Sequence, residues 1–209
     1  MYMKTNCTLT VADTLKTIKL VDSLIRQIRK PTKANKGKRG QSIEHVLGIP
    51  NGNSLTDLKD GELKSYTRGQ TICITQLKHC LGEIIDTKVS FWESKVGIKM
   101  KNAIFVSFYK SGQYNEHTHV NKHTHPVHYA HVEEDYNFIC DEIRQRQRTN
   151  TMLSTITGPN GVLQVRTKAS KRKKGGYREL SHNGWIANDK NMAFYLMGRF
   201  GIELFQRCV

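Results

Sequence analysis

The segment TDLKDGELK, residues 56–64, combines a turn with the start of a predicted strand. If residues 61–66 form a strand, Glu62 and Lys64 lie two positions apart and project from the same face. Asp57 approaches them from the preceding turn, so that two carboxylates and an amine converge. Hard oxygen ligands of this kind hold Mg²⁺ while leaving coordination positions for water and a phosphate. Alone, the pattern is also that of an ordinary solvated strand face, where acidic residues beside a lysine are common.

The flanking segments predict helices and strands in mixed order. Apolar residues spaced three and four apart predict an amphipathic helix over residues 11–28 that ends before Pro31, and a shorter helix that stops at Gly48. Further elements are expected as strands at 61–66, 71–76 and 103–109, a helix from about 136 to 148, a strand pair around 161–167 and a closing helix over 191–205. Because helices and strands do not alternate regularly, the predicted class is α/β of the mixed α+β kind around a central mixed sheet flanked by helices.

Six histidines crowd into the polar stretch 111–131, which is expected to be a long loop. They are His117, His119, His123, His125, His128 and His131. The spacing of His117 and His119 is compatible with zinc ligands or with a general base. No cysteine or regular set of tetrahedral ligands accompanies these residues, so a solvated loop, or one that flanks a bound nucleic acid, is preferred.

The charge balance points to a polyanionic partner. The chain has 209 residues, with 33 Lys and Arg against 18 Asp and Glu, a formal charge of +15. The surplus gathers in residues 33–39 and 168–178. Clustered positive charge favours nucleic-acid binding, because each neutralised phosphate releases condensed counterions. The alternatives are a merely basic protein or a nuclear-localisation-like stretch.

Other sequence properties restrict the setting. With 37% apolar residues, the chain can form one domain, or one domain with two lobes. Five cysteines without a CxxC pair argue against a disulfide framework and against a zinc ribbon. No apolar run is long enough for a membrane span, and the start lacks the layout of a signal peptide. The expected location is therefore cytoplasmic.

Four further blocks carry a resemblance to a known family. The segment QSIEHVLG lies at 41–48, FWESK at 91–95 with KMK at 99–101 beyond it, LQVRTKA at 163–169 and AFYL at 193–196. With the segment at 57–64, this order resembles the mismatch-repair endonuclease MutH and the related GATC-cutting restriction endonucleases, members of the PD-(D/E)XK superfamily. The spacing between Asp57 and Glu62 is two residues shorter than in MutH, so Asp60 competes with Asp57 for the ligand position.

The resemblance implies specific roles for residues. Asp57 and Glu62 would bind Mg²⁺, for which Mn²⁺ would substitute, and Lys64 would be the catalytic lysine. Glu44 would be a third acidic group, and Lys99 a second lysine at the active site. Arg166, Lys168 and Tyr195 would face the DNA and read its sequence; lysine or arginine on a strand can reach the O6 and N7 atoms of guanine. Tyr195 could instead be a packed helix residue. Lys36 and Lys38, in the basic loop, are expected to contact phosphates.

The resemblance therefore implies a restriction-endonuclease-like core with two lobes around a DNA cleft. The catalytic lobe would cover about 1–110 and the readout lobe about 132–209. The implied activity is type II restriction cleavage of double-stranded DNA at a short site such as GATC, by a monomer that dimerises on DNA. A MutH-like strand nickase under a MutL-like activator is the first alternative. A non-catalytic DNA-binding protein is an alternative of another class.

Overall fold

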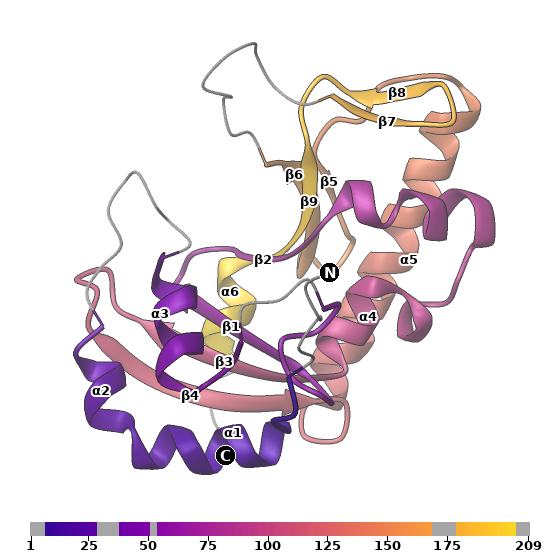
Figure 1. The fold of residues 1–209 in the computed structure, drawn as a ribbon. Coiled ribbons are helices and arrows are strands. Elements are labelled where there is room, and N and C mark those ends of the chain that lie inside the picture. Colours follow the sequence, from indigo (N-terminus) through magenta and orange to yellow (C-terminus); the bar gives the residue numbers. More distant parts are fainter. Residues whose placement is uncertain (1–6, 29–37, 51–53, 169–178, 204–209) are drawn as a thin grey trace, which may run out of the picture. The chain divides into compact units, whose positions relative to one another are not determined.

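The computed structural model describes residues 7–28, 38–50, 54–168 and 179–203, and Figure 1 shows the fold. The helices are α1 (Val11–Leu20), α2 (Asp22–Arg26), α3 (Lys38–Val46), α4 (Lys95–Met100), α5 (Pro126–Arg148) and α6 (Gly198–Glu203). Short helical turns cover η1 (Leu77–His79), η2 (Glu83–Thr87) and η3 (Phe91–Glu93). The strands are β1 (Glu62–Thr67), β2 (Ile72–Gln76), β3 (Asn102–Phe108), β4 (Tyr114–Asn121), β5 (Ile156–Thr157), β6 (Leu163–Thr167), β7 (Leu180–His182), β8 (Trp185–Asn188) and β9 (Met192–Leu196).

The chain divides into two compact units, each made of separate stretches of sequence. The first unit comprises residues 1–70, 98–124 and 201–209, and the second comprises 71–97 and 125–200. The described strands form three sheets, with the orders β1-β3-β4, β2-β9-β6-β5 and β7-β8. The predicted mixed α+β class is therefore confirmed. Among the described residues, no helix is long and apolar enough to cross a membrane.

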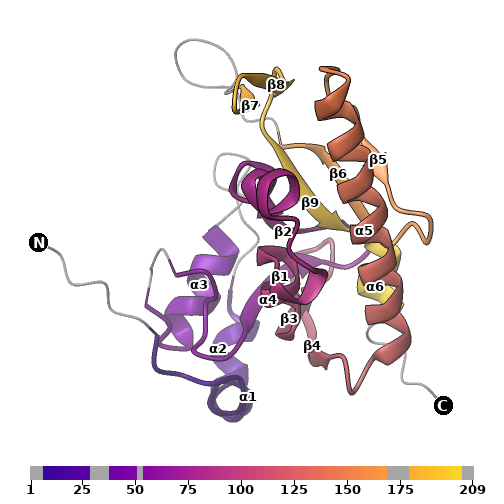
Figure 2. The same ribbon diagram turned by 90° about the vertical axis from the view of Figure 1, so that its right-hand side faces the viewer.

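The first unit is built on the sheet β1-β3-β4, in which β1 runs parallel to β3 and β3 antiparallel to β4. Glu62 lies opposite Ala103 at the start of this pairing. The chain can enter β1 there only because residue 61 is glycine: a Cβ atom on Gly61 would lie 2.2 Å from the carbonyl oxygen of Asn102. Apolar residues from α1, α2, α3 and this sheet share one core, and these helices gather on one side of the sheet (Figure 2).

The predicted helix over residues 11–28 is in fact two helices, α1 and α2, separated at Val21. The backbone of Val21 leaves the helical region, with φ −105° and ψ 17°, and its N–H bonds to the carbonyl of Thr17 to close α1. Ile18 and Ile25, on either side of the break, are both buried, whereas Leu20 and Leu24 are 83% and 48% exposed. The regular spacing of apolar residues across 18–25 therefore predicted one continuous helix where the chain forms two.

The prediction of a long loop over residues 111–131 is wrong. Residues Tyr114–Asn121 form β4, and α5 begins at Pro126. Since β4 is an edge strand, Glu116 is exposed and its other polar side chains are only partly buried, while Tyr114 and Val120 are buried. Such a strand lacks a strong apolar alternation. The proline at the first position of α5 is a usual start signal that could have located the helix.

The second unit contains the antiparallel sheet β2-β9-β6-β5 with α5 alongside it (Figure 2). The predicted closing helix over 191–205 is wrong: residues Met192–Leu196 form β9, and of the described residues in this range only Gly198–Glu203 are helical. Met192, Ala193, Phe194 and Leu196 of β9 are buried, so its apolar residues do not alternate with polar ones. A short apolar run of this kind fits a buried strand and a buried helix equally well by periodicity.

The described cysteines, Cys7, Cys73, Cys80 and Cys140, are free thiols. Burial, as the main cause, raises the pKa of Cys80 and of Cys140 to about 12. Both thiols therefore stay protonated at neutral pH and pack as small apolar side chains.

Candidate active site

Four predicted site residues of the first unit come together at the start of β1. Glu62 and Lys64 project from this strand, Asp57 precedes it, and Lys99 belongs to the last turn of α4. The Nζ atom of Lys99 lies 2.8 Å from Oε1 of Glu62, and Lys64 donates to the same oxygen. The Nζ atom of Lys64 is also 3.6 Å from Oδ2 of Asp57. Two carboxylates and two ammonium groups thus form one charged cluster.

Glu62 is the centre of this cluster and is almost completely buried. Its side chain is 1% exposed, whereas those of Lys64 and Lys99 are 21% and 14% exposed. Its second oxygen, Oε2, accepts the backbone N–H of Asp57 at 3.2 Å. Burial of a carboxylate costs free energy unless paired charges and hydrogen bonds replace its hydration. The two lysines and this backbone donor supply them, while the lysines stay partly open to solvent.

Asp57 and Glu44 complete the acidic side of the cluster. Oδ2 of Asp57 accepts the backbone N–H of Leu63 at 3.3 Å, which ties the turn to β1. Glu44 lies on α3, whose Gly40 faces β1: a Cβ atom there would be 3.5 Å from Oγ of Ser65 and 3.8 Å from Oε1 of Glu44. Burial is the main cause that raises the pKa of Glu44, and the nearby negative charge of Asp57 raises it further. Glu44 therefore shares the electrostatic environment of the cluster.

Asp60, the competing carboxylate in the same turn, has a different function. Its Oδ1 atom accepts the backbone N–H of Val11 at 2.7 Å, at the first residue of α1. The backbone carbonyl of Asp60 accepts from the side-chain amide of Asn102 at 3.0 Å. An acidic side chain at a helix N-terminus satisfies an unpaired N–H and is stabilised by the helix dipole. The geometry therefore favours Asp57 over Asp60 as a group of the charged cluster.

The donor atoms at this cluster fit a hard divalent cation. Among the residues that the structure describes, no three His, Cys, Asp or Glu side chains are grouped to hold a metal ion. Mg²⁺, however, is commonly held by only one or two carboxylates, with water and phosphate oxygens at the other positions. Asp57 and Glu62 are adjacent carboxylates of this type, held by the backbone contacts of the turn. They are the residues that could bind Mg²⁺ here.

The predicted readout residues Arg166, Lys168 and Tyr195 lie in the second unit, at and beside paired strands of its sheet. The guanidinium of Arg166 stacks over the Tyr195 ring at 4.5 Å from its centroid, and donates to Oγ1 of Thr71 at 2.6 Å. Lys168 follows β6 and is exposed, and its Nζ lies 3.5 Å from Sγ of Cys73. Burial, as the main cause, raises the pKa of Tyr195 to about 12. Its hydroxyl therefore stays protonated at neutral pH, and it lies on a strand, not on a helix.

Thr71 and Cys73 were not predicted at this surface. They come from β2 and the residue before it, and they meet Arg166 and Lys168 only because β2 and β6 both pair with β9. Each contact spans 95 positions of the chain. No local motif marks either residue, so only the pairing of the strands reveals them.

Three of the six histidines, His117, His119 and His128, have local structural contacts. Nδ1 of His117 lies 2.8 Å from the hydroxyl of Tyr114, and Nε2 of His119 lies 2.6 Å from Oδ1 of Asn102. Burial, as the main cause, lowers the pKa of both imidazoles, so they are neutral at pH 7. The ring of His128, in α5, packs edge-on against Phe200. These contacts account for several of the histidines as structural residues of β4 and α5.

The last two predicted DNA-contacting residues are Lys36 and Lys38. Lys38 is exposed and is the first residue of that helix, whereas Lys36 lies outside the described residues. A comparison of the chain with protein-family models and with curated proteins finds no match in either.

Proposed function

We propose that this protein is a Mg²⁺-dependent endonuclease that cuts double-stranded DNA at a short specific sequence. The observation that carries the proposal is the buried Glu62 carboxylate, contacted by Lys64 and Lys99 and next to Asp57. Ion pairs on an ordinary strand surface are exposed to solvent. They do not place a buried carboxylate between two lysines that contact the same oxygen. A restriction-endonuclease-like core around this cluster, as in MutH-like enzymes, belongs to the same proposal.

In this proposal each charged group has a different role in hydrolysis. Asp57 and Glu62 would hold Mg²⁺, which when bound supplies positive charge at the phosphate and lowers the pKa of a coordinated water. Lys64 donates hydrogen bonds to the phosphoryl oxygens as negative charge grows on them, and Lys99 keeps the Glu62 carboxylate in place. An oxygen of water bonds to phosphorus while the bond to the 3′ oxygen breaks. The products carry 5′-phosphate and 3′-hydroxyl ends.

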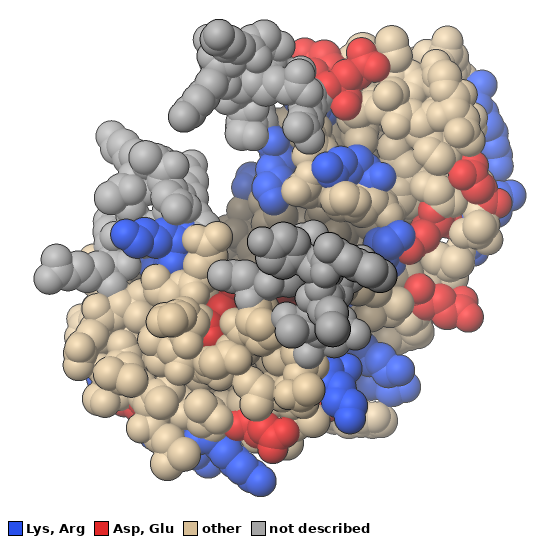
Figure 3. All heavy atoms as spheres, viewed as in Figure 1, with Lys and Arg blue, Asp and Glu red and all other residues tan. Residues whose placement is uncertain are grey.

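The charge distribution supports a nucleic-acid substrate. The formal charge is +15, and Figure 3 shows Lys and Arg side chains in several separate groups on one face of the molecule. Such surfaces attract DNA through its phosphates without reading the sequence. The stacked Arg166 and Tyr195, with Lys168 beyond them, provide donors at a sheet surface that suit base contacts.

Replacing Lys168 with alanine is expected to weaken discrimination between the true site and a site with one altered base pair by about 1 to 3 kcal/mol, the energy of a good base contact. General affinity for DNA should change less. The measurement is equilibrium binding to the two duplexes in EDTA. Lys78→Ala, which removes another exposed lysine of the second unit, is the matched control. Equal losses on both duplexes would assign Lys168 to phosphate contacts instead.

The described part of the chain has one such cluster, and one active centre hydrolyses one strand at a time. Cutting both strands at a palindrome therefore needs two protomers on the site, or two successive visits by one. The high positive charge favours DNA binding without a recruiting partner. We therefore favour a self-sufficient restriction-type enzyme, a monomer that pairs on its site, over a MutH-like nickase that depends on a MutL-like activator.

The direct test is incubation of supercoiled, unmethylated plasmid with the protein in Mg²⁺, in Mn²⁺ and in EDTA. The proposal predicts an open-circle intermediate and then linear or fragmented DNA, with the second cut accelerating as the protein concentration rises. Sequencing the ends then identifies the site. Arrest at open circles would favour the nickase, and binding without any cleavage would favour a non-catalytic DNA-binding protein.

A further inference from the structure

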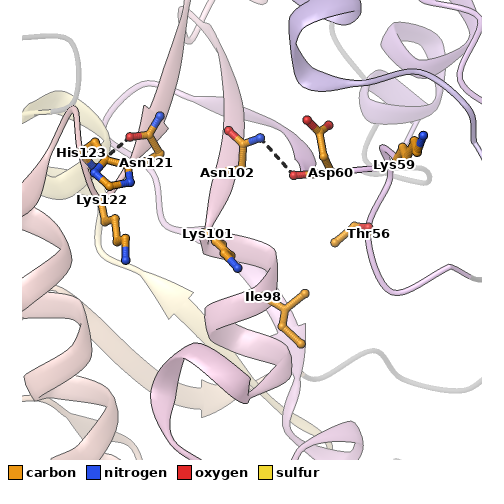
Figure 4. Close-up of a pocket in the computed structure, with 9 residues that line it drawn as sticks. All are labelled: Thr56, Lys59, Asp60, Ile98, Lys101, Asn102, Asn121, Lys122 and His123. Atoms are coloured by element: carbon orange, nitrogen blue, oxygen red, sulfur yellow. Dashed lines mark hydrogen bonds between the residues drawn. The ribbon is translucent and has the colours of Figure 1, made fainter.

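A pocket of about 510 Å³ lies in the first unit, next to the proposed catalytic residues in the sequence. Its lining is drawn in Figure 4 and consists of Thr56, Lys59, Asp60, Ile98, Lys101, Asn102, Asn121, Lys122 and His123. Thr56 immediately precedes Asp57, and Lys101 lies two residues after Lys99. Since consecutive Cα atoms are about 3.8 Å apart, these lining residues are within about 8 Å of the catalytic ones, measured between Cα atoms.

The charge of the lining is positive. Lys59, Lys101 and Lys122 stand against the single carboxylate of Asp60. That carboxylate already accepts the N–H of Val11 at the N-terminus of α1, which offsets part of its charge. Among the described residues, neither Lys59 nor Lys101 forms a salt bridge, and both are exposed. The pocket therefore offers ammonium groups to an anion.

The side chains of Thr56, Asn102 and Asn121 in the lining are already hydrogen-bonded within the protein. Asn102 bonds to Asp60 and to His119. The side-chain oxygen of Asn121 accepts the backbone N–H groups of His123 and Thr124, and the hydroxyl of Thr56 donates to the carbonyl of Leu58. A ligand recognised through hydrogen bonds to these groups, such as the edge of a base, would have to break the hydrogen bonds that they already form within the protein. A ligand that is bound by its charge alone would leave these hydrogen bonds intact.

We infer that this pocket binds a backbone phosphate of the DNA strand, flanking the phosphodiester that is cut. The inference rests on the proposed nuclease function, and it adds a positioning site to it. Adjacent phosphates of one strand are spaced about 3.4 Å along the helix axis, so a strand bound at Asp57 and Glu62 would present a neighbouring phosphate near Lys59 and Lys101. A flanking contact of this kind fixes the register of the strand without reading its sequence.

The test compares the double variant Lys59→Gln/Lys101→Gln with the wild-type chain in equilibrium binding to a duplex of about 20 base pairs in EDTA, where no cleavage occurs. Loss of one phosphate contact is expected to lower affinity about tenfold at 100 mM salt, and to reduce the slope of log K against log salt by about one. The control Lys110→Gln removes an exposed lysine of the same unit, located beyond the opposite end of β3.

A second measurement identifies the phosphate. Methylphosphonate substitution removes the charge of one backbone position at a time along the duplex that the protein binds. Wild-type binding should weaken at one flanking position, and the double variant should be insensitive there, because the two changes remove the same contact. If the double variant behaves like Lys110→Gln, or remains sensitive at every position, the pocket does not bind phosphate, whereas cleavage of plasmid in Mg²⁺ would still support the nuclease. If the chain never cuts DNA but this coupling is found, the phosphate site stands and the nuclease fails.

Discussion

Lys64→Ala is expected to lower the rate of Mg²⁺-dependent DNA cleavage by at least about two to three orders of magnitude, the loss typical of removing one preorganised electrostatic group. Glu62→Ala should do the same, because it removes the carboxylate to which both lysines bond. DNA binding should largely survive Lys64→Ala, since one ammonium group is a small part of the total charge of +15. Single-turnover cleavage of a duplex with the mapped site measures the rate.

The control for this experiment must separate catalysis from folding. Glu62→Ala leaves two ammonium groups without their shared buried partner, which destabilises a protein as well as inactivating it. Thermal unfolding is therefore measured for each variant, and Lys110→Ala, at the far end of β3, serves as the neutral lysine replacement. Undiminished cutting by Lys64→Ala, or full activity in EDTA, would falsify the assignment of the active site.

The second large effect is expected on stability, at Asp135 of α5. This residue is fully buried, and its carboxylate accepts the backbone N–H groups of Asn160 at 2.7 Å, Val162 at 2.7 Å and Leu163 at 2.8 Å. Asp135→Ala leaves these donors without an acceptor. Since an unsatisfied buried donor costs about 1 to 3 kcal/mol, the free energy of unfolding should fall by about 3 kcal/mol or more.

The contacts of Asp135 also bear on the predicted readout surface, because they hold the chain that enters β6, the strand of Arg166. Gly158 confirms how tightly this chain packs: a Cβ atom there would lie 2.2 Å from Cγ of Asp135. Urea unfolding followed by circular dichroism measures the loss. Asp141→Asn is the control on the same helix, since Asp141 is 75% exposed and its ion pair with Arg144 is worth at most about 1 kcal/mol. Similar losses for both variants would show that the buried carboxylate is not a main support of the second unit.

Several elements could be predicted because their signal is local. Strands β1, β2 and β3 were expected within about a residue of their observed bounds, since each is a short run of suitable residues between turn signals. The proximity of Asp57, Glu62 and Lys64 also follows from one segment, because strand geometry places alternate side chains on one face. The end of α5 near Arg148 was likewise predicted, from buried residues at helical spacing.

Other features depend on which segments meet. The β4 strand escaped prediction because its edge position leaves polar residues on its surface, and β9 because its buried residues form a continuous apolar run from Met192 to Phe194. Asp135 gave no signal, since an acidic residue in a helix is ordinary until the backbone of residues 160–163 lies against it. In each case burial, which is a property of the whole fold, decided the outcome.

The sequence alone determined the chemistry available to this protein: the acidic and basic groups near the start of β1, the surplus of positive charge, and the mixed class of the fold. Tertiary structure decided which of those groups meet. It directed Asp60 to the N-terminus of α1 and placed Lys99 on Glu62 across 37 positions of the chain. It also brought Thr71 to Arg166 through the shared pairing with β9. The reason is physical: local periodicity orients a side chain within its own element, whereas contacts between distant elements depend on strand register and on burial of the shared core.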